Sequence, residues 1–249
     1  MDERGAYQYF EDVNWGLLRL WNGRRGLDVL DVGCGFAATS ERIAQLGNRV
    51  IGIEESPAAV AIAKTRLAHV VQLDLQKFDE VARELGDRRF DAIVLADVLE
   101  HLAWPTGVLR KYASLLKDDG VVLISLPNVG MWSVRLGLAF GRFHYDETGV
   151  LDRTHLRFFT RSSAVQMIAE AGLEPLRRTY NPGLVRPFVP LAKKLLARGG
   201  DGDSDPGALL NSRPYRLYLK TIYPIERLIA GLWPGALAFQ MIFEARRKR

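Results

Sequence analysis

The segment 29–38 constrains the fold more than any other part of the chain. It starts as an apolar strand that includes Asp31, continues through a turn with glycines at Gly33 and Gly35, and ends at the start of a helix. Glycine lets the backbone turn sharply and lets a ligand approach closely, because it carries no Cβ. A strand, a glycine turn and a helix in this order predict the ligand-binding turn of a doubly wound α/β sheet.

Short apolar segments alternate with helical patterns through the first 126 residues. Each apolar segment is bounded by polar residues or glycine, as expected for buried parallel strands. We expect strands over 27–32, 49–54, 69–73, 90–95 and 120–126. We expect helices over 38–46, 57–66, 78–85 and 105–116. This alternation predicts a sheet whose strands are joined by right-handed crossovers.

The alternation of strand and helix patterns ends after residue 126, at Pro127-Asn128. A helix is expected over 162–171, followed by strands over 174–180 and 239–246. We interpret the long stretch between these strands as an insertion, so that the last strand returns to the sheet. The expected fold is a single α/β domain with a doubly wound, mostly parallel, seven-stranded sheet. Its expected additions are an N-terminal lid helix within 1–25, a substrate-side insertion over 128–160 and a basic, aromatic insertion over 184–238.

Acidic residues occur at the ends of four successive expected strands. They are Asp31, Glu54, Asp74 and Asp97. The carboxyl ends of parallel strands meet at one edge of the sheet, where open α/β sheets bind ligands. A carboxylate just before the glycine turn suits a cationic ligand and would repel a pyrophosphate.

Five segments resemble, in order, the motifs of class I S-adenosylmethionine-dependent methyltransferases. They are residues 29–37, 50–54, 71–75, 90–102 and 120–128. Residues 90–102 are especially similar to ubiquinone-type O-methyltransferases. Residues 125–128 and 151–160 resemble bacterial methyltransferases of cell-surface glycan and lipid-linked sugar pathways, and a methyltransferase-like protein of methionine biosynthesis.

The resemblance implies a Rossmann-like methyltransferase fold and S-adenosylmethionine as the cofactor. Its two cationic groups, an ammonium and a sulfonium, fit the acidic strand ends. Asp31, Gly33 and Gly35 would face the methionine part, and Glu54 would accept hydrogen bonds from both ribose hydroxyls. Asp74 would accept the exocyclic amine of the adenine, with Leu75 packed on the ring. Ala96 and Asp97, at the end of the fourth strand, complete the expected cofactor site.

Methyl transfer to a hydroxyl requires the loss of a proton, and histidine is the natural base near neutral pH. His101 follows the fourth expected strand and His155 lies in the 128–160 insertion, so both can face the methyl group. A packing role for His101, and a loop-anchoring hydrogen bond from His155 to Asp152 or Thr154, are equally open. His69 begins a strand and His144 lies in an aromatic loop. No residues stand at metal-ligand spacing, so no metal site is expected.

Charge is distributed unevenly along the chain. Residues 1–174 carry 20 basic and 24 acidic residues, whereas residues 175–249 carry 14 basic and 5 acidic residues. The 184–238 insertion interleaves cations with aromatic residues, which favours contact with an anionic membrane. A solvated basic face, or a cap with its aromatics packed inward, is the alternative. RNA is a weaker candidate, because no RNA-binding module is recognisable.

Cys34 is the only cysteine and no apolar signal segment follows Met1, which favours a reducing, cytoplasmic location with possible membrane association. The function we expect is O-methylation of a hydroxyl on a glycan, lipid-linked or small-molecule acceptor. Two alternatives remain open at this point. One is a non-catalytic, cofactor-binding partner protein. The other is a nicotinamide oxidoreductase, which Asp31 and Asp74 disfavour.

Overall fold

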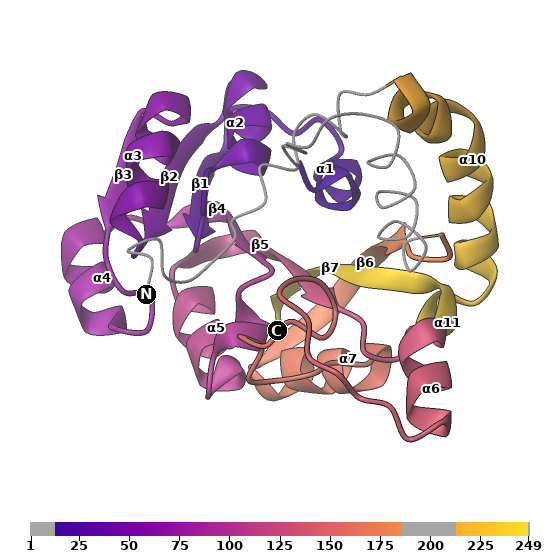
Figure 1. Cartoon of the computed structure of the whole chain (residues 1–249). Helices are drawn as coiled ribbons and strands as arrows, with labels where there is room; N and C mark the ends of the chain where they lie inside the picture. Colours follow the sequence, from indigo (N-terminus) through magenta and orange to yellow (C-terminus); the bar gives the residue numbers. More distant parts are fainter. Residues whose placement is uncertain (1–12, 186–212, 249) are drawn as a thin grey trace.

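The computed structural model describes residues 13–185 and 213–248, and it contains a seven-stranded sheet (Figure 1). The strand order is β3-β2-β1-β4-β5-β7-β6, and β7 runs antiparallel to the other six strands. The strands are β1 (Asp28–Val32), β2 (Arg49–Glu54), β3 (His69–Gln72), β4 (Phe90–Ala96), β5 (Leu116–Pro127), β6 (Leu173–Pro182) and β7 (Ala238–Arg247). The expected doubly wound, mostly parallel sheet is therefore confirmed.

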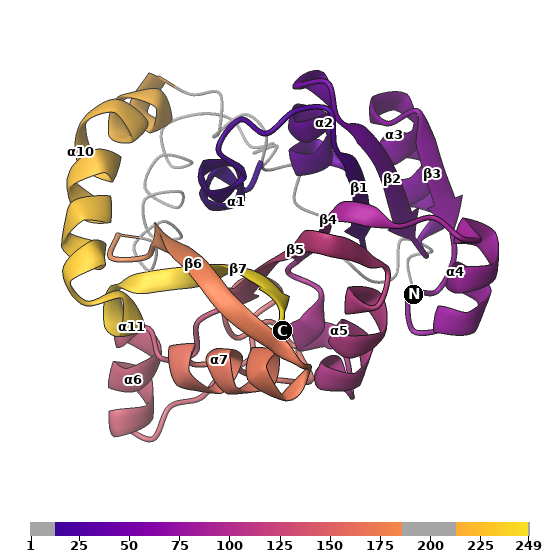
Figure 2. The same cartoon turned by 180° about the vertical axis from the view of Figure 1, so that it is seen from behind.

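Helices cover both faces of this sheet (Figures 1 and 2). On one face lie α1 (Trp15–Trp21), α2 (Ala38–Gln45) and α3 (Pro57–Arg66), which bury Leu17, Trp21 and Ile43 against the strands. On the other face lie α4 (Phe78–Leu85), α5 (Pro105–Ala113) and α7 (Arg161–Glu170), which bury Leu109 and Ile168. Two apolar layers thus hold the strand ends at fixed positions.

Strand order reverses beside β1. The chain runs from β1 outward through β2 to β3, then crosses back to β4 on the other side of β1. The carboxyl ends of β1 and β4 therefore flank a crevice, which is where open α/β sheets bind ligands. The glycine turn after β1 lies at this point.

The last strand returns to the sheet, as expected from its apolar sequence. β7 inserts between β5 and β6, with Ile242 opposite both Ser125 and Thr179. The buried carboxylate of Glu244 on β7 forms ion pairs with Arg24 and Arg177, both at hydrogen-bond distance. These contacts join β7 to β6 and to the loop before β1.

Several elements differ from the sequence-based expectations. β5 begins at Leu116 rather than at residue 120, because Leu116 pairs with Phe90 before a register shift at which β5 carries the extra residues. The 128–160 insertion contains a helix that its sequence pattern did not reveal, α6 (Trp132–Ala139). The stretch before β7 forms one long helix, α10 (Arg213–Leu232), and the short α11 (Pro234–Leu237). Of the basic and aromatic residues expected to act together there, Arg186, Phe188, Lys193 and Lys194 lie outside the described residues.

Candidate active site

A cavity of about 780 Å³ opens at the carboxyl ends of β1, β2 and β4. This volume lies within the range of small-molecule and cofactor sites. Every residue of the expected cofactor site lines it: Asp31, Gly33, Gly35, Glu54, Asp74, Leu75, Ala96 and Asp97. His101 and His155 line it too. The sheet therefore gathers residues that are far apart in the sequence into one pocket.

The glycine turn is tied to the neighbouring strand. The amides of Gly33 and Cys34 both donate to the carbonyl oxygen of Ile53, at 2.8 and 3.0 Å. Gly33 has a φ of 71°, and a Cβ at this position would lie 2.7 Å from a methyl group of Val98. Only glycine fits both the left-handed backbone and this close approach.

Asp31, at the end of β1, is almost fully buried. Ser40 Oγ donates to its carboxylate at 2.5 Å. Burial raises the pKa of Asp31 to about 7, and the charge of Glu54 adds to this rise while the Ser40 hydrogen bond opposes it. A buried carboxylate with a raised pKa gains stability when a cation binds beside it, since the opposite charge favours the ionised form.

Glu54, at the end of β2, holds the turn together. Its Oε2 accepts from the amide of Gly35 at 2.9 Å, and its Oε1 accepts from the amides of Glu55 and Ser56 at 3.0 and 2.9 Å. The carboxylate is therefore fixed in place before any ligand arrives. The sequence predicted only its contact with a ribose and not this role in the turn.

The next two expected residues lie on the loop after β3. Asp74 Oδ1 accepts from the amide of Gln76 at 2.8 Å, which fixes its carboxylate at the cavity. Tyr112 Oη donates to the carbonyl oxygen of Leu75 at 2.8 Å, and this bond anchors the same loop to α5.

Asp97 is held by residues that the sequence analysis did not identify. Gln240 Nε2 on β7 lies 2.7 and 2.6 Å from the two carboxylate oxygens of Asp97. Asn181 on β6 and Asn14 before α1 donate to Oε1 of the same glutamine, at 2.5 and 3.2 Å. All three line the cavity. The available signal was a polar glutamine within the apolar run 238–243.

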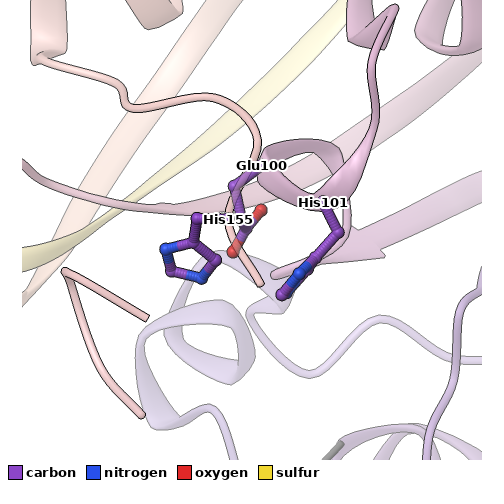
Figure 3. Close-up of side chains that lie close together, drawn as sticks. All are labelled: Glu100, His101 and His155. Atoms are coloured by element: carbon purple, nitrogen blue, oxygen red, sulfur yellow. The ribbon is translucent and has the colours of Figure 1, made fainter. Parts of the chain in front are cut away.

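Glu100, His101 and His155 also line the cavity, and Figure 3 shows their side chains gathered at one place. The two imidazoles meet edge to face, with ring centroids 4.8 Å apart. Glu100 and His101 come from the 3₁₀ turn after β4 (Leu99–His101), and His155 comes from the loop after α6. One ligand atom from each side chain lies within 4.8 Å of the others. Spacing along the chain did not reveal this group, because two separate segments contribute to it. His69 and His144 are exposed and lie outside the cavity lining.

The two histidines are held by backbone contacts. His101 Nδ1 lies 3.3 Å from the carbonyl oxygen of Thr154, and His155 Nδ1 lies 3.3 Å from that of Val150. Of the two residues expected to anchor the loop at His155, Asp152 does so, since its carbonyl oxygen accepts from the His155 amide at 3.1 Å, whereas Thr154 Oγ1 donates to Asp152 at 2.6 Å. Burial, together with neighbouring His155, lowers the pKa of His101, and burial lowers the pKa of His155. Both shifts favour the neutral form of the imidazole.

Acidic groups dominate the lining of the cavity. Arg153 is the one lysine or arginine among the described residues that line it. The carboxylates of the lining are Asp31, Glu54, Glu55, Asp74, Asp97, Glu100, Glu147 and Asp152. Such a lining suits a ligand with an ammonium and a sulfonium group and disfavours the pyrophosphate of a dinucleotide. The residues present therefore fit S-adenosylmethionine.

A doubly wound sheet with an acidic pocket at its switch point defines a class I S-adenosylmethionine-dependent methyltransferase. A family model of the methyltransferase domain matches residues 6–177. The chain belongs to this methyltransferase family.

Curated relatives agree with this assignment. The chain is 33% identical over 167 residues to a ubiquinone biosynthesis O-methyltransferase of Xanthomonas axonopodis pv. citri, which covers 61% of this chain and 69% of that protein. It is 29% identical over 163 residues to the protein of the same name from Cereibacter sphaeroides, covering 63% of this chain and 65% of that protein. The matches thus span about two thirds of the length of these relatives.

Solved structures share the fold. A SAM-dependent methyltransferase from Archaeoglobus fulgidus matches with a TM-score of 0.59 at 16% identity, over 93% of this chain and 91% of that chain. The magnesium protoporphyrin IX methyltransferase of Synechocystis, solved with bound SAH, matches with a TM-score of 0.54 at 17% identity, over 93% and 78%. At these identities the likeness concerns the fold alone.

Proposed function

We propose that this methyltransferase transfers a methyl group to a hydroxyl of a glycan, a lipid-linked sugar or another small acceptor. The observation that carries the proposal is that one cavity is lined by two groups of residues. Asp31 and Glu54 line its first end, at the carboxyl ends of β1 and β2, and His101 and His155, from the segments after β4 and after α6, line its second end. The names of the curated relatives, which are O-methyltransferases, support a hydroxyl acceptor.

The first end of the cavity would hold the cofactor. Asp31 would pair with the ammonium group, and Glu54, already oriented by three backbone amides, would accept the ribose hydroxyls. Asp74 and Leu75 would meet the adenine. When bound, S-adenosylmethionine supplies a methyl group on a sulfonium, which is a good leaving group. The pocket therefore has mainly to align the reacting atoms, and orientation of this kind contributes much of the rate.

The second end would hold the acceptor. Nδ1 of each histidine faces a backbone carbonyl, which can only accept, so each neutral ring carries its hydrogen on Nδ1. The lone pair is then on Nε2 and can accept a hydrogen bond from an acceptor hydroxyl. His155 packs edge to face on Phe158, with ring centroids 6.1 Å apart, and Phe158 packs edge to face on Phe143, with ring centroids 5.7 Å apart. These two phenylalanines lie outside the cavity lining and support the loop that carries His155.

The acceptor is found most directly by mass spectrometry. Glycans and lipids are extracted from a strain that lacks this protein and compared with those of the parent strain. We expect one species to lose the mass of a single CH₂ group. Restoring the wild-type gene should restore the mass, whereas a His155→Ala version should not. An unchanged set of glycans and lipids would mean that the acceptor is a water-soluble small molecule instead.

A further inference from the structure

We propose that Glu100, His101 and His155 bind one divalent transition-metal ion at the acceptor end of the cavity. A carboxylate and two imidazoles supply the N and O donors that zinc, iron, cobalt and manganese accept. Their ligand atoms lie within 4.8 Å of one another. The role of the ion in catalysis rests on the proposed function, but its binding does not.

The histidine tautomers support a metal site. The Thr154 hydroxyl directs its hydrogen at Asp152, so towards His101 it can only accept, as does the Thr154 carbonyl. Nδ1 of His101 is therefore the protonated nitrogen, and the same argument applies to His155 and the carbonyl of Val150. Histidines that bind metals through Nε2 donate Nδ1–H to a carbonyl or carboxylate in this way.

Glu100 provides the second observation. Its side chain is 1% exposed and faces the cavity lining. Apart from its own backbone amide, neither carboxylate oxygen meets a hydrogen-bond donor among the described residues. A buried carboxyl without hydrogen-bond partners destabilises a fold. A cation bound between Glu100 and the imidazoles would remove this cost.

The surrounding charge also favours a cation. Asp97, Glu147 and Asp152 line the same cavity, so their carboxylates attract positive charge. Three protein ligands leave coordination positions open toward the cavity. With the ion bound, the Nε2 lone pairs would ligate the metal, so the acceptor hydroxyl would be activated by the metal as a Lewis acid instead of by a hydrogen bond to a histidine.

The test is metal binding by the untagged full chain. Protein is stripped with a chelator, dialysed, and titrated with Co²⁺ alone while its visible absorption is recorded, and with Zn²⁺ by calorimetry. We expect one equivalent to bind. Glu100→Gln and His155→Ala should each weaken Co²⁺ binding by about 100-fold. Substitution of a residue that only supports a metal ligand already weakens binding by up to about 100-fold, and these two residues would be ligands themselves. His144→Ala is the matched control, since His144 is exposed and lies outside the cavity.

Calorimetry with S-adenosylhomocysteine shows whether each variant still folds and binds the cofactor. Unchanged Co²⁺ affinity in a folded Glu100→Gln or His155→Ala variant would overturn the proposal, as would wild-type protein that binds no stoichiometric ion. A protein that binds Co²⁺ and transfers no methyl group to any hydroxyl would instead contradict the proposed function and leave the metal site intact.

A separate observation concerns the outer surface. We infer that α6 and α10 together form a surface that lies on an anionic lipid membrane. Both helices lie at the same side of the molecule in Figures 1 and 2, and Arg135 on α6 reaches the carbonyl of Gly235 in α11. Large apolar side chains are exposed on both, with Leu228 72% and Leu232 82% exposed. The others are Leu136, Leu138 and Phe140 near α6, and Leu217, Ile222, Ile225, Ile229 and Trp233 near α10.

The charge of this surface fits anionic lipids. Lys220, Arg227 and Arg142 are exposed beside the apolar residues. Among the residues of α6 and α10 the one acid is Glu226, which is buried and accepts hydrogen bonds from Tyr218 and the Val185 amide. Apolar faces flanked by cations bind at the interface of anionic membranes. None of the helices described has the length and apolar character needed to cross a bilayer, so contact would be peripheral.

Sedimentation with vesicles tests this inference. We expect wild-type protein to sediment with vesicles of phosphatidylglycerol and phosphatidylcholine at low salt and to release as salt rises, since screening acts over about 10 Å at 0.1 M. Leu228→Glu with Leu232→Glu should abolish sedimentation, whereas Leu176→Glu, an exposed leucine on β6, should not. Wild-type protein that ignores these vesicles, or a double variant that still binds them, would overturn the inference.

Discussion

Gln240 on the last strand donates from one nitrogen to both carboxylate oxygens of Asp97, at 2.7 and 2.6 Å. The two residues are 143 positions apart in the sequence. Asp97 has a φ of 56°, a left-handed conformation that is uncommon for a residue other than glycine. The return of β7 to the sheet thus fixes the orientation of a carboxylate at the centre of the pocket.

Gln240→Ala should therefore lower cofactor affinity. Without the amide, Asp97 keeps its charge but loses its orienting donor, and hydrogen bonds to charged groups contribute about 1.5–3 kcal/mol. We expect about a tenfold rise in the Kd for S-adenosylmethionine, measured by calorimetry. Gln240→Leu, which fills the same space without the amide, should show the same loss. Wild-type affinity in Gln240→Leu would mean that Asp97 needs no support from β7.

Glu54→Ala should weaken cofactor binding more strongly than Gln240→Ala does. The account predicts a loss of one to two orders of magnitude, about 1.4–2.8 kcal/mol, because charge-assisted hydrogen bonds to the ribose disappear. The structure adds that the turn loses the acceptor of three backbone amides, so the free energy of unfolding should fall as well.

Glu54→Gln separates the two effects of the Glu54 substitution, since it keeps an acceptor oxygen for the turn but removes the charge. Calorimetry and urea unfolding are measured on both variants. Unchanged cofactor affinity in folded Glu54→Ala protein would remove the ribose assignment.

The raised pKa of Asp31 predicts how the free energy of unfolding depends on pH. Its pKa is raised from 3.8 to about 7 in the fold, mainly by burial. A carboxyl whose pKa is raised by folding contributes stability that is fully present below its unfolded pKa and is lost as pH rises through the folded pKa. The free energy of unfolding should therefore fall by roughly 1.4 kcal/mol per pH unit from this group between the two values.

Cofactor affinity should change in the opposite direction. The ionised form of Asp31 pairs with the ammonium group, so affinity should rise from about pH 6 to about pH 8. Asp31→Asn should flatten both curves relative to the wild type, as measured by urea unfolding and calorimetry across this range. Parallel wild-type and Asp31→Asn curves would show that another group titrates.

Sequence patterns predicted the features that depend on residues close together in the chain. The strands around Asp31 and Glu54, and the acidic series at the strand ends, follow from apolar runs and glycine turns. The contacts of Gln240 with Asp97, and of Glu100 with His155, depend on how distant segments pack. Helix α6 was also not predicted. Its apolar residues are largely exposed, and they do not recur at the spacing of a helix face that packs on a core.

Glu244 should be the polar residue of β7 on which stability depends most. It is buried, and burial acts to raise its pKa, but hydrogen bonds from Arg177 and Arg24 outweigh this and hold the pKa below its usual value. Glu244→Gln should lower the free energy of unfolding by about 2–3 kcal/mol. Breaking a buried pair costs about 3–5 kcal/mol, and here both arginines are partly exposed to water.

Glu174→Gln is the matched control for Glu244→Gln. Its ion pair with Arg246 is exposed on both sides, and exposed pairs contribute at most about 1 kcal/mol. The free energy of unfolding that the wild type gains from Glu244 should also be lost as the pH falls through the lowered pKa of this residue. Equal effects of the two substitutions in urea unfolding would contradict the role assigned to Glu244.

The central claim is that one cavity binds S-adenosylmethionine at the Asp31 and Glu54 end and carries out methyl transfer to a hydroxyl at the His101 and His155 end. The most direct test incubates purified protein with S-adenosylmethionine that carries a labelled methyl group and with a lipid and glycan extract from cells that lack the protein. The account predicts label on an oxygen of one acceptor, and a kcat at least about 100-fold lower for His155→Ala at an unchanged cofactor Kd. No labelled acceptor, or equal turnover by wild type and His155→Ala, would contradict it.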